Sequence, residues 1–253
     1  MNNATLTSRT QREPELFGQT VVVIGGSAGI GLETARRARA EGADVILTAR
    51  NSERLQRAAS ELGALRSAAF DANDPASLEK FFVDLPTPID HVMVTGPGPH
   101  YWPVMEIEFE QARTALSEHM LLALWVARNA ARKVRPGGTL LFMGGTFGRR
   151  PRRGLALVSA VTAAMPAFVA NLALDLAPVR VNLIAAGFVD TPLSVSLLGD
   201  QIDARRDELR TSLPIRRVVG PADVAALAVH IMINETLTGA TYDVDGGQQL
   251  VAG

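Results

Sequence analysis

Cysteine is absent from this sequence, which excludes a disulfide framework, a thiolate metal site and a cysteine nucleophile. Long apolar runs are missing as well, and the opening stretch from Met1 to Gln19 is polar, without the apolar block of a secretion signal. The net charge is −1 with acids and bases interspersed, so no basic surface for nucleic acid or an anionic membrane is expected. These absences predict a cytoplasmic protein that acts on a small molecule, with no nucleic-acid partner, no membrane partner and no metal.

The sequence instead has one continuous pattern, in which short apolar or β-branched runs alternate with longer amphipathic ones. Such alternation is typical of βαβ units around a parallel sheet. The predicted strands are 20–25, 44–49, 64–70, 91–95, 139–144, 179–185 and 240–244. The predicted helices are 30–40, 52–62, 75–83, 110–134, 155–176 and 221–233. We therefore predict an α/β fold with a seven-stranded parallel sheet and helices on both faces.

No linker divides the chain, so residues 17–253 are predicted to form a single domain behind a flexible tail at 1–16. The longest departure from the strand and helix alternation is at 188–214. A long segment after the carboxyl end of a strand is a usual place for a substrate lid. We predict that this segment is the lid.

The clearest chemical signal is a glycine-rich turn between the first predicted strand and the first predicted helix. Glycines there allow a tight turn and a close backbone approach to a pyrophosphate, while the helix N-terminus directs N–H groups at the phosphates. The alternative is a turn that needs glycine only for positive φ. Strand, spacing and helix agree, so we assign to dinucleotide binding Gly25, Ser27, Ala28, Gly29, Ile30 and Gly31.

The second predicted strand ends at the position where an adenosine ribose would lie. An acidic residue there would select NAD, whereas Ala49 and Arg50 offer an uncharged site and a guanidinium for a 2′-phosphate. We therefore predict NADP(H) as the cofactor, bound by Arg50 and Asn51, although a solvated surface arginine is the alternative. After the third strand, Asp71 and Ala72 are placed beside the adenine; Asp71 could equally cap the helix that follows.

Three further segments complete a resemblance to the short-chain dehydrogenase/reductase family of the classical, single-domain type. They are 95–98 (T-G-P-G), 181–187 (V-N-L-I-A-A-G) and 243–247 (D-V-D-G-G). The resemblance covers nearly the whole chain and implies a Rossmann-type doubly wound sheet, a nicotinamide cofactor, and a homodimer or homotetramer. It adds to the cofactor site Thr95, Gly96, Gly187, Val189 and Thr191.

The departures from this family concern its catalytic residues. An ungapped alignment through 136–138 places the family's serine at Gly145, its tyrosine at Val158, its lysine at Thr162 and its asparagine at His119. By the resemblance, tyrosine would exchange the proton and lysine would lower its pKa, but a valine has no titratable atom. The cofactor half of the family pattern is present and the catalytic half is replaced.

Tyrosine and lysine are too scarce to form such a pair elsewhere, because Tyr101, Tyr242, Lys80 and Lys133 are the only ones. Of these, only Tyr101 falls near the expected nicotinamide site.

The remaining candidates for a proton donor are His119, Tyr101 and His100, and histidine is favoured because it titrates near neutrality. The alternatives are a core histidine paired with a backbone carbonyl at 119, and loop packing at 100 and 101.

Arginines at 149–153 follow the fifth strand and either attract an anionic substrate or form a solvated loop. Two functions remain open. The first is an NADP(H)-dependent oxidoreductase acting on a small, largely apolar carbonyl or alcohol by a non-standard or substrate-assisted proton path. The second is a catalytically silent homologue that binds NADP(H) as a sensor, scaffold or inactive subunit.

Overall fold

The computed structural model describes residues 13–96, 98–149 and 151–251. Most of the predicted tail, Pro97 of the 95–98 segment and Arg150 of the arginine run lie outside these residues. Leu16, which we had placed in the tail, is fully buried, and its backbone N–H donates to the carbonyl of Glu41 (2.9 Å). The packed domain therefore begins earlier than predicted, because an apolar side chain at 16 joins the core.

Seven parallel strands form one sheet in the order β3-β2-β1-β4-β5-β6-β7. They are β1 (Thr20–Ile24), β2 (Asp44–Ala49), β3 (Arg66–Ala69), β4 (Ile89–Val94), β5 (Val134–Gly145), β6 (Arg180–Ala186) and β7 (Thr241–Val244). The order reverses between β1 and β4, which makes the fold doubly wound and opens a crevice at their carboxyl ends. The predicted Rossmann-type fold class is confirmed.

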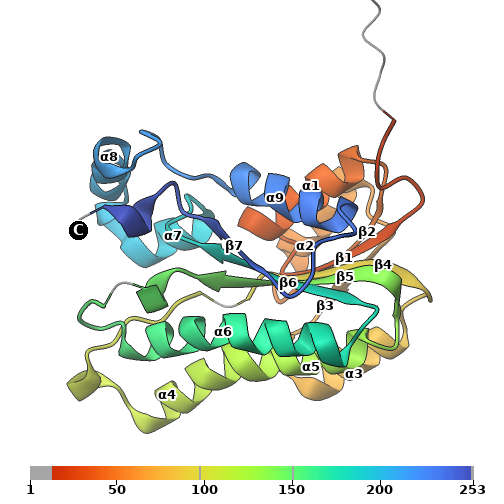
Figure 1. The fold of residues 1–253 in the computed structure, drawn as a ribbon, viewed down its shortest axis with the longest axis horizontal. Helices are drawn as coiled ribbons and strands as arrows, with labels where there is room; N and C mark the ends of the chain where they lie inside the picture. Colours follow the sequence, from red (N-terminus) through yellow and green to blue (C-terminus); the bar gives the residue numbers. More distant parts are fainter. Residues whose placement is uncertain (1–12, 97, 150, 252–253) are drawn as a thin grey trace, which may run out of the picture.

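Helices cover both faces of the sheet (Figure 1). On one face lie α1 (Gly29–Ala40), α2 (Ser52–Leu62) and α9 (Pro221–Ile233), and on the other α3 (Pro75–Val83), α4 (Phe109–Leu116), α5 (Leu122–Ala130) and α6 (Ala156–Asp175). Each face has its own cluster of buried apolar side chains. The strands are apolar along nearly their whole length because both sides of a parallel sheet are buried.

The segment predicted as a lid folds into two helices at the carboxyl edge of the sheet (Figure 1). They are α7 (Pro192–Leu198) and α8 (Ile202–Ser212), joined by the short helix η4 (Gly199–Gln201). Leu209 and Leu213 are almost fully buried, so α8 is packed onto the domain. This position covers the crevice that the strand order creates.

The single long helix predicted at 110–134 is wrong in two respects. A π-helical segment, η2 (Ser117–Leu121), separates α4 from α5, and the helix ends at Ala130. Val134 instead begins β5 and pairs with Ile89, while the Ile89 N–H donates to the carbonyl of Lys133 (2.9 Å). Val134 is in a strand and not in a helix because it pairs with the neighbouring strand β4. The residues around it in the sequence do not indicate this pairing.

Helix α6 is long and apolar enough, by length and composition, to cross a membrane. In the fold it lies along the sheet, and Met165, Val169 and Leu172 belong to the buried cluster on that face. This helix is an exception to the expected absence of long apolar runs, and packing against the sheet accounts for only part of its apolar character, because 33% of its apolar stretch is buried.

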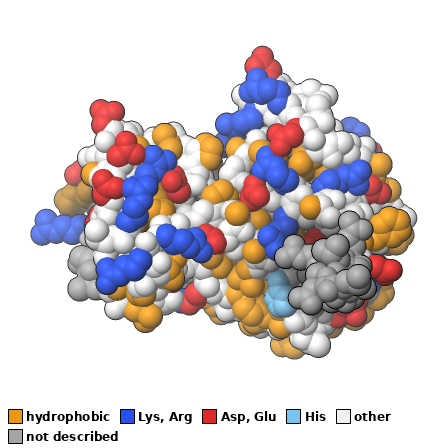
Figure 2. Space-filling view, turned by 90° about the horizontal axis from the view of Figure 1, so that it is seen from above, with side chains coloured by type: hydrophobic (Ala, Val, Ile, Leu, Met, Phe, Trp, Pro, Cys, Tyr) orange, Lys and Arg blue, Asp and Glu red, His pale blue; other side chains and the backbone are white. Residues whose placement is uncertain are grey.

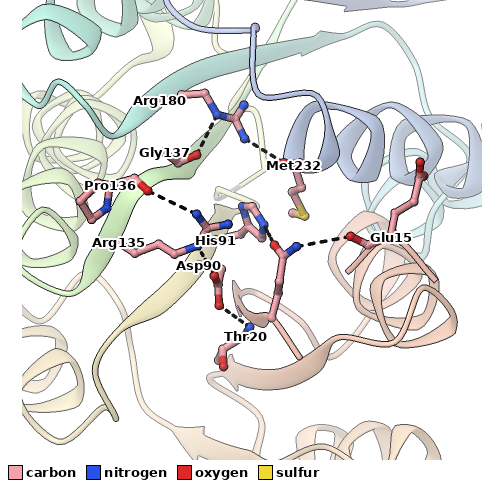
Figure 3. A network of polar contacts seen from close by, with 10 residues as sticks. Glu15, Thr20, Asp90, His91, Arg135, Pro136, Gly137, Arg180 and Met232 are labelled. Atoms are coloured by element: carbon pink, nitrogen blue, oxygen red, sulfur yellow. Dashed lines mark hydrogen bonds and ion pairs between the residues drawn. The ribbon is translucent and has the colours of Figure 1, made fainter. Parts of the chain in front are cut away.

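A polar network joins the amino ends of several strands, far from the carboxyl edge (Figure 3). The guanidinium of Arg180, a residue only 5% exposed, donates to five backbone carbonyls, including those of Gly137 (3.0 Å) and Met232 (2.8 Å). Beside it, His91 is buried with its Nε2 2.7 Å from Gln19 Oε1, and burial lowers the pKa of His91 to about 3. Arg180 and the Nε2 of His91 are paired, whereas His91 Nδ1 is buried without a hydrogen-bond partner among the described residues. The paired groups link backbone segments to one another, so the network serves the fold.

Candidate active site

The glycine turn between β1 and α1 is packed so closely that side chains would not fit. A Cβ at Gly31 would lie 2.3 Å from the Gly25 carbonyl oxygen, and one at Gly25 would lie 2.2 Å from Thr95 Oγ1. The Thr95 hydroxyl, just after β4, is 3.0 Å from the Ile24 carbonyl oxygen and ties the two strand ends together. Gly25 and Gly29 also have positive φ, of 90° and 53°. Glycine is therefore needed in this turn both for close packing of the backbone and for positive φ, the two reasons that the sequence left open.

Helix α1 begins directly from this turn. Ala28 is its N-cap with extended backbone, and no side chain caps the helix in the described structure. The first N–H groups of an α-helix have no partner within the helix, and the dipole end is positive. Ser27 is nearly buried, and residues 29 and 31 are glycines, so few side chains cover the backbone at this turn. A pyrophosphate could therefore approach the backbone N–H groups.

The residues predicted to contact the adenosine lie at one edge, because β2 and β3 are neighbours. Arg50 is exposed, and Asn51 caps α2 by accepting from the Arg54 N–H (2.8 Å). Asp71 accepts from the Asn73 N–H (3.0 Å) in a turn of its own. The alternative that Asp71 caps α3 is wrong, because Asp74 does so, and Ala72 packs against the apolar cluster beneath.

A cavity of about 450 Å³ lies at the carboxyl edge of the sheet. It joins the glycine turn and the end of β4 to the end of β6 and the lid. Its lining includes nearly all the residues predicted for the nicotinamide end, namely Ile30, Thr95, Gly96, Gly187, Val189 and Thr191. Side chains from α7 and the loop before it, Phe188, Leu193, Ser194, Leu197 and Leu198, form an apolar wall. The segment at 188–214 thus borders the cavity as a lid would.

Close contacts hold the lid against the cofactor turn. Thr191 caps α7 by accepting from the Ser194 N–H (3.3 Å), and its Cβ lies 3.4 Å from the place a Cβ at Gly29 would take. A Cβ at Gly187 would lie 2.6 Å from the side-chain oxygen of Gln248, so glycine is needed there for close approach of the C-terminal segment. The base of the lid and the dinucleotide turn are therefore one packed unit.

The four residues predicted to stand at the family's catalytic positions all line this cavity: His119, Gly145, Val158 and Thr162. The Thr162 hydroxyl donates to the Val158 carbonyl (2.8 Å) and accepts from the Gly148 N–H (3.1 Å). A Cβ at Gly145 would lie 2.9 Å from a ring carbon of Phe147, so a side chain at 145 would collide with that ring. Thr162 is thus engaged in holding the loop before α6, and Gly145 leaves its space to Phe147.

His119 lies in the π-helical segment η2, half-buried. Its Nδ1 is 3.0 Å from the Ala115 carbonyl oxygen. A carbonyl oxygen can only accept, so Nδ1 carries a proton, and Nε2 is the ring nitrogen that this carbonyl does not engage. This backbone pairing is the one expected of a structural histidine, yet His119 also lines the cavity and a small void behind it. Helical π-segments often occur at functional sites.

Of the other two predicted proton donors, only Tyr101 lines the cavity. It packs edge-on against Phe147, with ring centroids 5.8 Å apart. Partial burial raises the pKa of Tyr101 to about 12, although the charge of Arg205 opposes this rise. His100 is outside the cavity lining, stacks on Trp102 and has its Nε2 3.3 Å from Glu118 Oε2. The structure therefore brings together His119 and Tyr101 but not His100.

The arginine run divides into residues with different roles. Arg149 forms an ion pair with Asp243 and donates to the side-chain oxygen of Gln249 (2.8 Å). Arg152 and Arg153 are exposed and line the cavity. Among the described residues, no group of His, Asp or Glu is arranged to hold a metal ion.

Comparison with known proteins adds to this geometry. A family model described as enoyl-(acyl carrier protein) reductase matches residues 25–249. A short-chain dehydrogenase/reductase from Stachybotrys chlorohalonatus is 27% identical, covering 92% of this chain and 98% of its own. The chain belongs to the short-chain dehydrogenase/reductase family.

Further members of this family are similar over equal lengths. An NADP-dependent (R)-specific alcohol dehydrogenase from Lentilactobacillus kefiri is 28% identical, covering 92% of this chain and 97% of its own. A small-chain dehydrogenase solved in complex with NADPH superposes with a TM-score of 0.79, at 28% identity, covering 92% of this chain and 99% of its own.

Sequence reasoning missed several residues that line the cavity of this short-chain dehydrogenase/reductase: Thr146, Phe147, Arg205, Gln248 and Gln249. Thr146 follows β5, which ends at Gly145, and the chain bends at 146, so the alternation of side chains along a strand does not set its direction. Arg205, Gln248 and Gln249 come from segments far along the chain. No local signal identifies such residues.

Proposed function

We propose that this protein is an NADP(H)-dependent oxidoreductase that transfers hydride to or from a small, largely apolar carbonyl or alcohol substrate. The observation that carries the proposal is the cavity lined by Ile30 next to the glycine turn, by the lid and by His119. Cofactor contacts and an ionisable side chain thus face one space of about 450 Å³. A volume of this order suits a small molecule.

The cofactor site is assembled from this chain's own groups. The N–H groups at the start of α1 would hold the pyrophosphate, and Arg50 would bind the 2′-phosphate that distinguishes NADP(H) from NAD(H). Val189 and Thr191 would face the nicotinamide carboxamide, as the family resemblance implies. Two similar proteins whose names include NADP or NADPH support this cofactor. When bound, NADPH supplies the hydride for reduction and NADP⁺ accepts it for oxidation.

The proton path differs from the family's usual one. Val158 stands at the position aligned with the catalytic tyrosine, and a hydrocarbon performs no acid or base chemistry. Thr162, at the lysine position, has its hydroxyl engaged with the backbone. His119 is the residue we assign to proton transfer: Nε2 of the neutral ring accepts a proton from an alcohol, and the doubly protonated ring returns one to an alkoxide.

Tyr101 contributes differently. Its raised pKa keeps the phenol protonated across neutral pH, so it donates a hydrogen bond to the substrate oxygen without giving up its proton. If the substrate takes its proton from its own hydroxyl group or from water, proton transfer does not need His119. Holding the hydride donor and acceptor in reacting geometry lowers the activation free energy by roughly 7–11 kcal/mol. A general acid contributes a smaller rate factor, about 10²–10⁴-fold, so turnover does not require the usual tyrosine.

The test compares wild type with His119→Ala, using His100→Ala as the matched control outside the cavity lining. NADPH oxidation is followed at steady state against a panel of ketones, enones and quinones. We expect His119→Ala to lower kcat by about 10²–10⁴-fold with unchanged NADPH affinity, and His100→Ala to stay within a few-fold of wild type. Equal, nonzero rates in wild type and His119→Ala would remove His119 from proton transfer and leave the substrate-assisted path.

The second candidate function is a catalytically silent homologue that binds NADP(H) as a sensor, scaffold or inactive subunit. The placement of Val158 and Gly145 on the cavity wall favours it, since neither offers a polar side chain to a substrate. Tight NADPH binding without oxidation against the whole panel would support this function over the first.

We also propose a homodimer or homotetramer built through the helices opposite α1 and α9. Large apolar side chains are exposed there on α4, η2, α5 and α6: Leu116, Leu121, Leu124 and Leu174, which is 79% exposed. Burying such a patch between copies would be favourable. Sedimentation velocity on wild type and Leu124→Glu tests this, and a monomer at micromolar wild-type concentration would contradict it.

A further inference from the structure

We propose that the substrate carries an oxoanion, a carboxylate or a phosphate ester, which binds at the mouth of the cavity to Arg152, Arg153 and Arg205. This inference rests on the proposed function and specifies its substrate class. The charged side chains that line the cavity are these three arginines, and none of its lining residues in the described part of the chain is Asp or Glu. The protein as a whole has a net charge of −1, so the positive charge is local to the cavity.

The two loop arginines have no ion-pair partner in the described part of the chain. Among the described residues, neither Arg152 nor Arg153 forms an ion pair or a side-chain hydrogen bond, although both line the cavity. Their loop is held in place, because the Trp102 N–H donates to the Gly154 carbonyl (3.0 Å) and the Leu155 N–H to that of Arg152 (3.3 Å). Guanidinium groups recognise carboxylate and phosphate oxygens through paired hydrogen bonds.

Arg205 extends the positive charge to the lid. Its guanidinium lies over the ring of Phe188, with 5.8 Å from Cζ to the ring centroid, and also contacts Glu208 (2.6 Å). The charge of Arg205 acts at Tyr101, whose pKa it lowers against the effect of burial. Arg205 therefore acts from the lid helix α8 on Tyr101, another residue that lines the cavity.

The other arginines nearby, and Arg205 itself, pair with acidic side chains, and Arg152 and Arg153 differ from them in having no such partner among the described residues. Arg149 pairs with Asp243, Arg206 with Asp190 and Asp203, and Arg210 with Asp207. Figure 2 shows the same mixture over the lobe on its left, where blue and red side chains are interleaved. If arginine were simply abundant, acidic side chains would be expected beside the cavity arginines as they are elsewhere on the surface. The described lining of the cavity has none.

The rest of the cavity defines the remainder of the substrate. Val158, Phe147 and Leu193 are among its lining residues, and nonpolar surface predominates there. The substrate therefore has an apolar body bearing the carbonyl or hydroxyl group, with the anionic group directed toward the arginines. Binding through such a remote group fixes the reacting end, which is one way to compensate for a missing catalytic side chain.

Three probes test this with the full-length protein: 4-oxo-4-phenylbutanoate, its uncharged methyl ester, and phenyl phosphate. Calorimetric titrations are run with and without saturating NADPH, on wild type, Arg152→Gln/Arg153→Gln and Arg205→Gln. The matched control is Arg210→Gln, which removes the same charge from α8 outside the cavity lining.

We expect at least one anion to bind wild type about tenfold or more tightly than the ester, and the double variant to remove most of this preference. Arg205→Gln weakens the preference, and Arg210→Gln preserves it. A tighter carboxylate identifies a free acid as the substrate type, and a tighter phenyl phosphate identifies a phosphate ester.

Two results would overturn the inference: neither anion binds better than the ester, or the preference survives in both cavity variants. NADPH affinity, measured on the same proteins, separates this failure from failure of the proposed function. Wild type that does not bind NADPH overturns the proposed function, whereas a lost anion preference with NADPH binding intact concerns the arginines alone.

Discussion

Arg206 of α8 donates two hydrogen bonds to Asp190, from Nε to Oδ2 (2.9 Å) and from Nη2 to Oδ1 (2.8 Å). Asp190 belongs to the segment that enters the lid, and its N–H donates to the carbonyl of Val219 (2.9 Å). This paired contact joins the second lid helix to the base of the lid. Fork-like pairs of this kind fix geometry as well as adding energy.

Replacing Arg206 by Gln should therefore loosen the lid. We expect about a three- to tenfold rise in KM for substrate, because the cavity wall formed by α7 and α8 becomes less well fixed. NADPH affinity should change less, and limited proteolysis within 199–214 should become faster. Arg210→Gln, on the same helix but paired with Asp207, is the control, and equal proteolysis rates in both variants would contradict this role.

Arg50→Asp should shift cofactor choice from NADPH toward NADH. The guanidinium after β2 is replaced by a carboxylate that repels a 2′-phosphate and accepts from a ribose hydroxyl. We expect NADPH affinity to fall by about tenfold or more while NADH affinity holds or improves. Titrations with both cofactors measure this, with Arg54→Asp on the adjoining helix as control. An unchanged ratio would show that Arg50 is only a solvated surface residue.

The pKa of His91 predicts a contribution to stability that depends on pH. In the folded protein this pKa is lowered by burial to about 3, against an ordinary value of 6.5, so the folded state keeps His91 neutral. The unfolded chain takes up the proton below pH 6.5. The contribution is therefore complete above pH 6.5 and is lost as the pH falls from 6.5 toward 3, by at most about 1.4 kcal/mol per pH unit.

Urea unfolding of wild type and His91→Gln between pH 7 and pH 4 measures this effect. The free energy of unfolding of the variant should fall less steeply with decreasing pH than that of wild type. His230→Gln, at an exposed position on α9, should follow the wild-type slope. Parallel slopes for wild type and His91→Gln would contradict the assignment.

Much of the cofactor side was predictable from sequence, because its signals are local. The glycine turn needs glycine at 31 because a side chain there would meet the carbonyl of Gly25 in the same turn, and the strand that precedes the turn is a short apolar run. Seven strands could be located in the same way, since burial on both faces of a parallel sheet leaves continuous apolar segments.

The substrate side was less predictable, because its partners are distant in the sequence. Arg149 is neutralised by Asp243, which lies 94 positions later, so the arginine run could not be divided into paired and unpaired members beforehand. The π-helical turn at His119 and the bend at Thr146 are likewise set by packing.

We propose that this chain retains a dinucleotide site beside an altered catalytic wall. The most direct measurement is a calorimetric titration of wild type and Gly31→Val with NADPH and NADH. The account predicts that wild type binds NADPH more tightly than NADH, and that Gly31→Val, whose side chain would collide with the Gly25 carbonyl oxygen, binds neither. Wild-type protein that remains folded yet binds neither cofactor would contradict it.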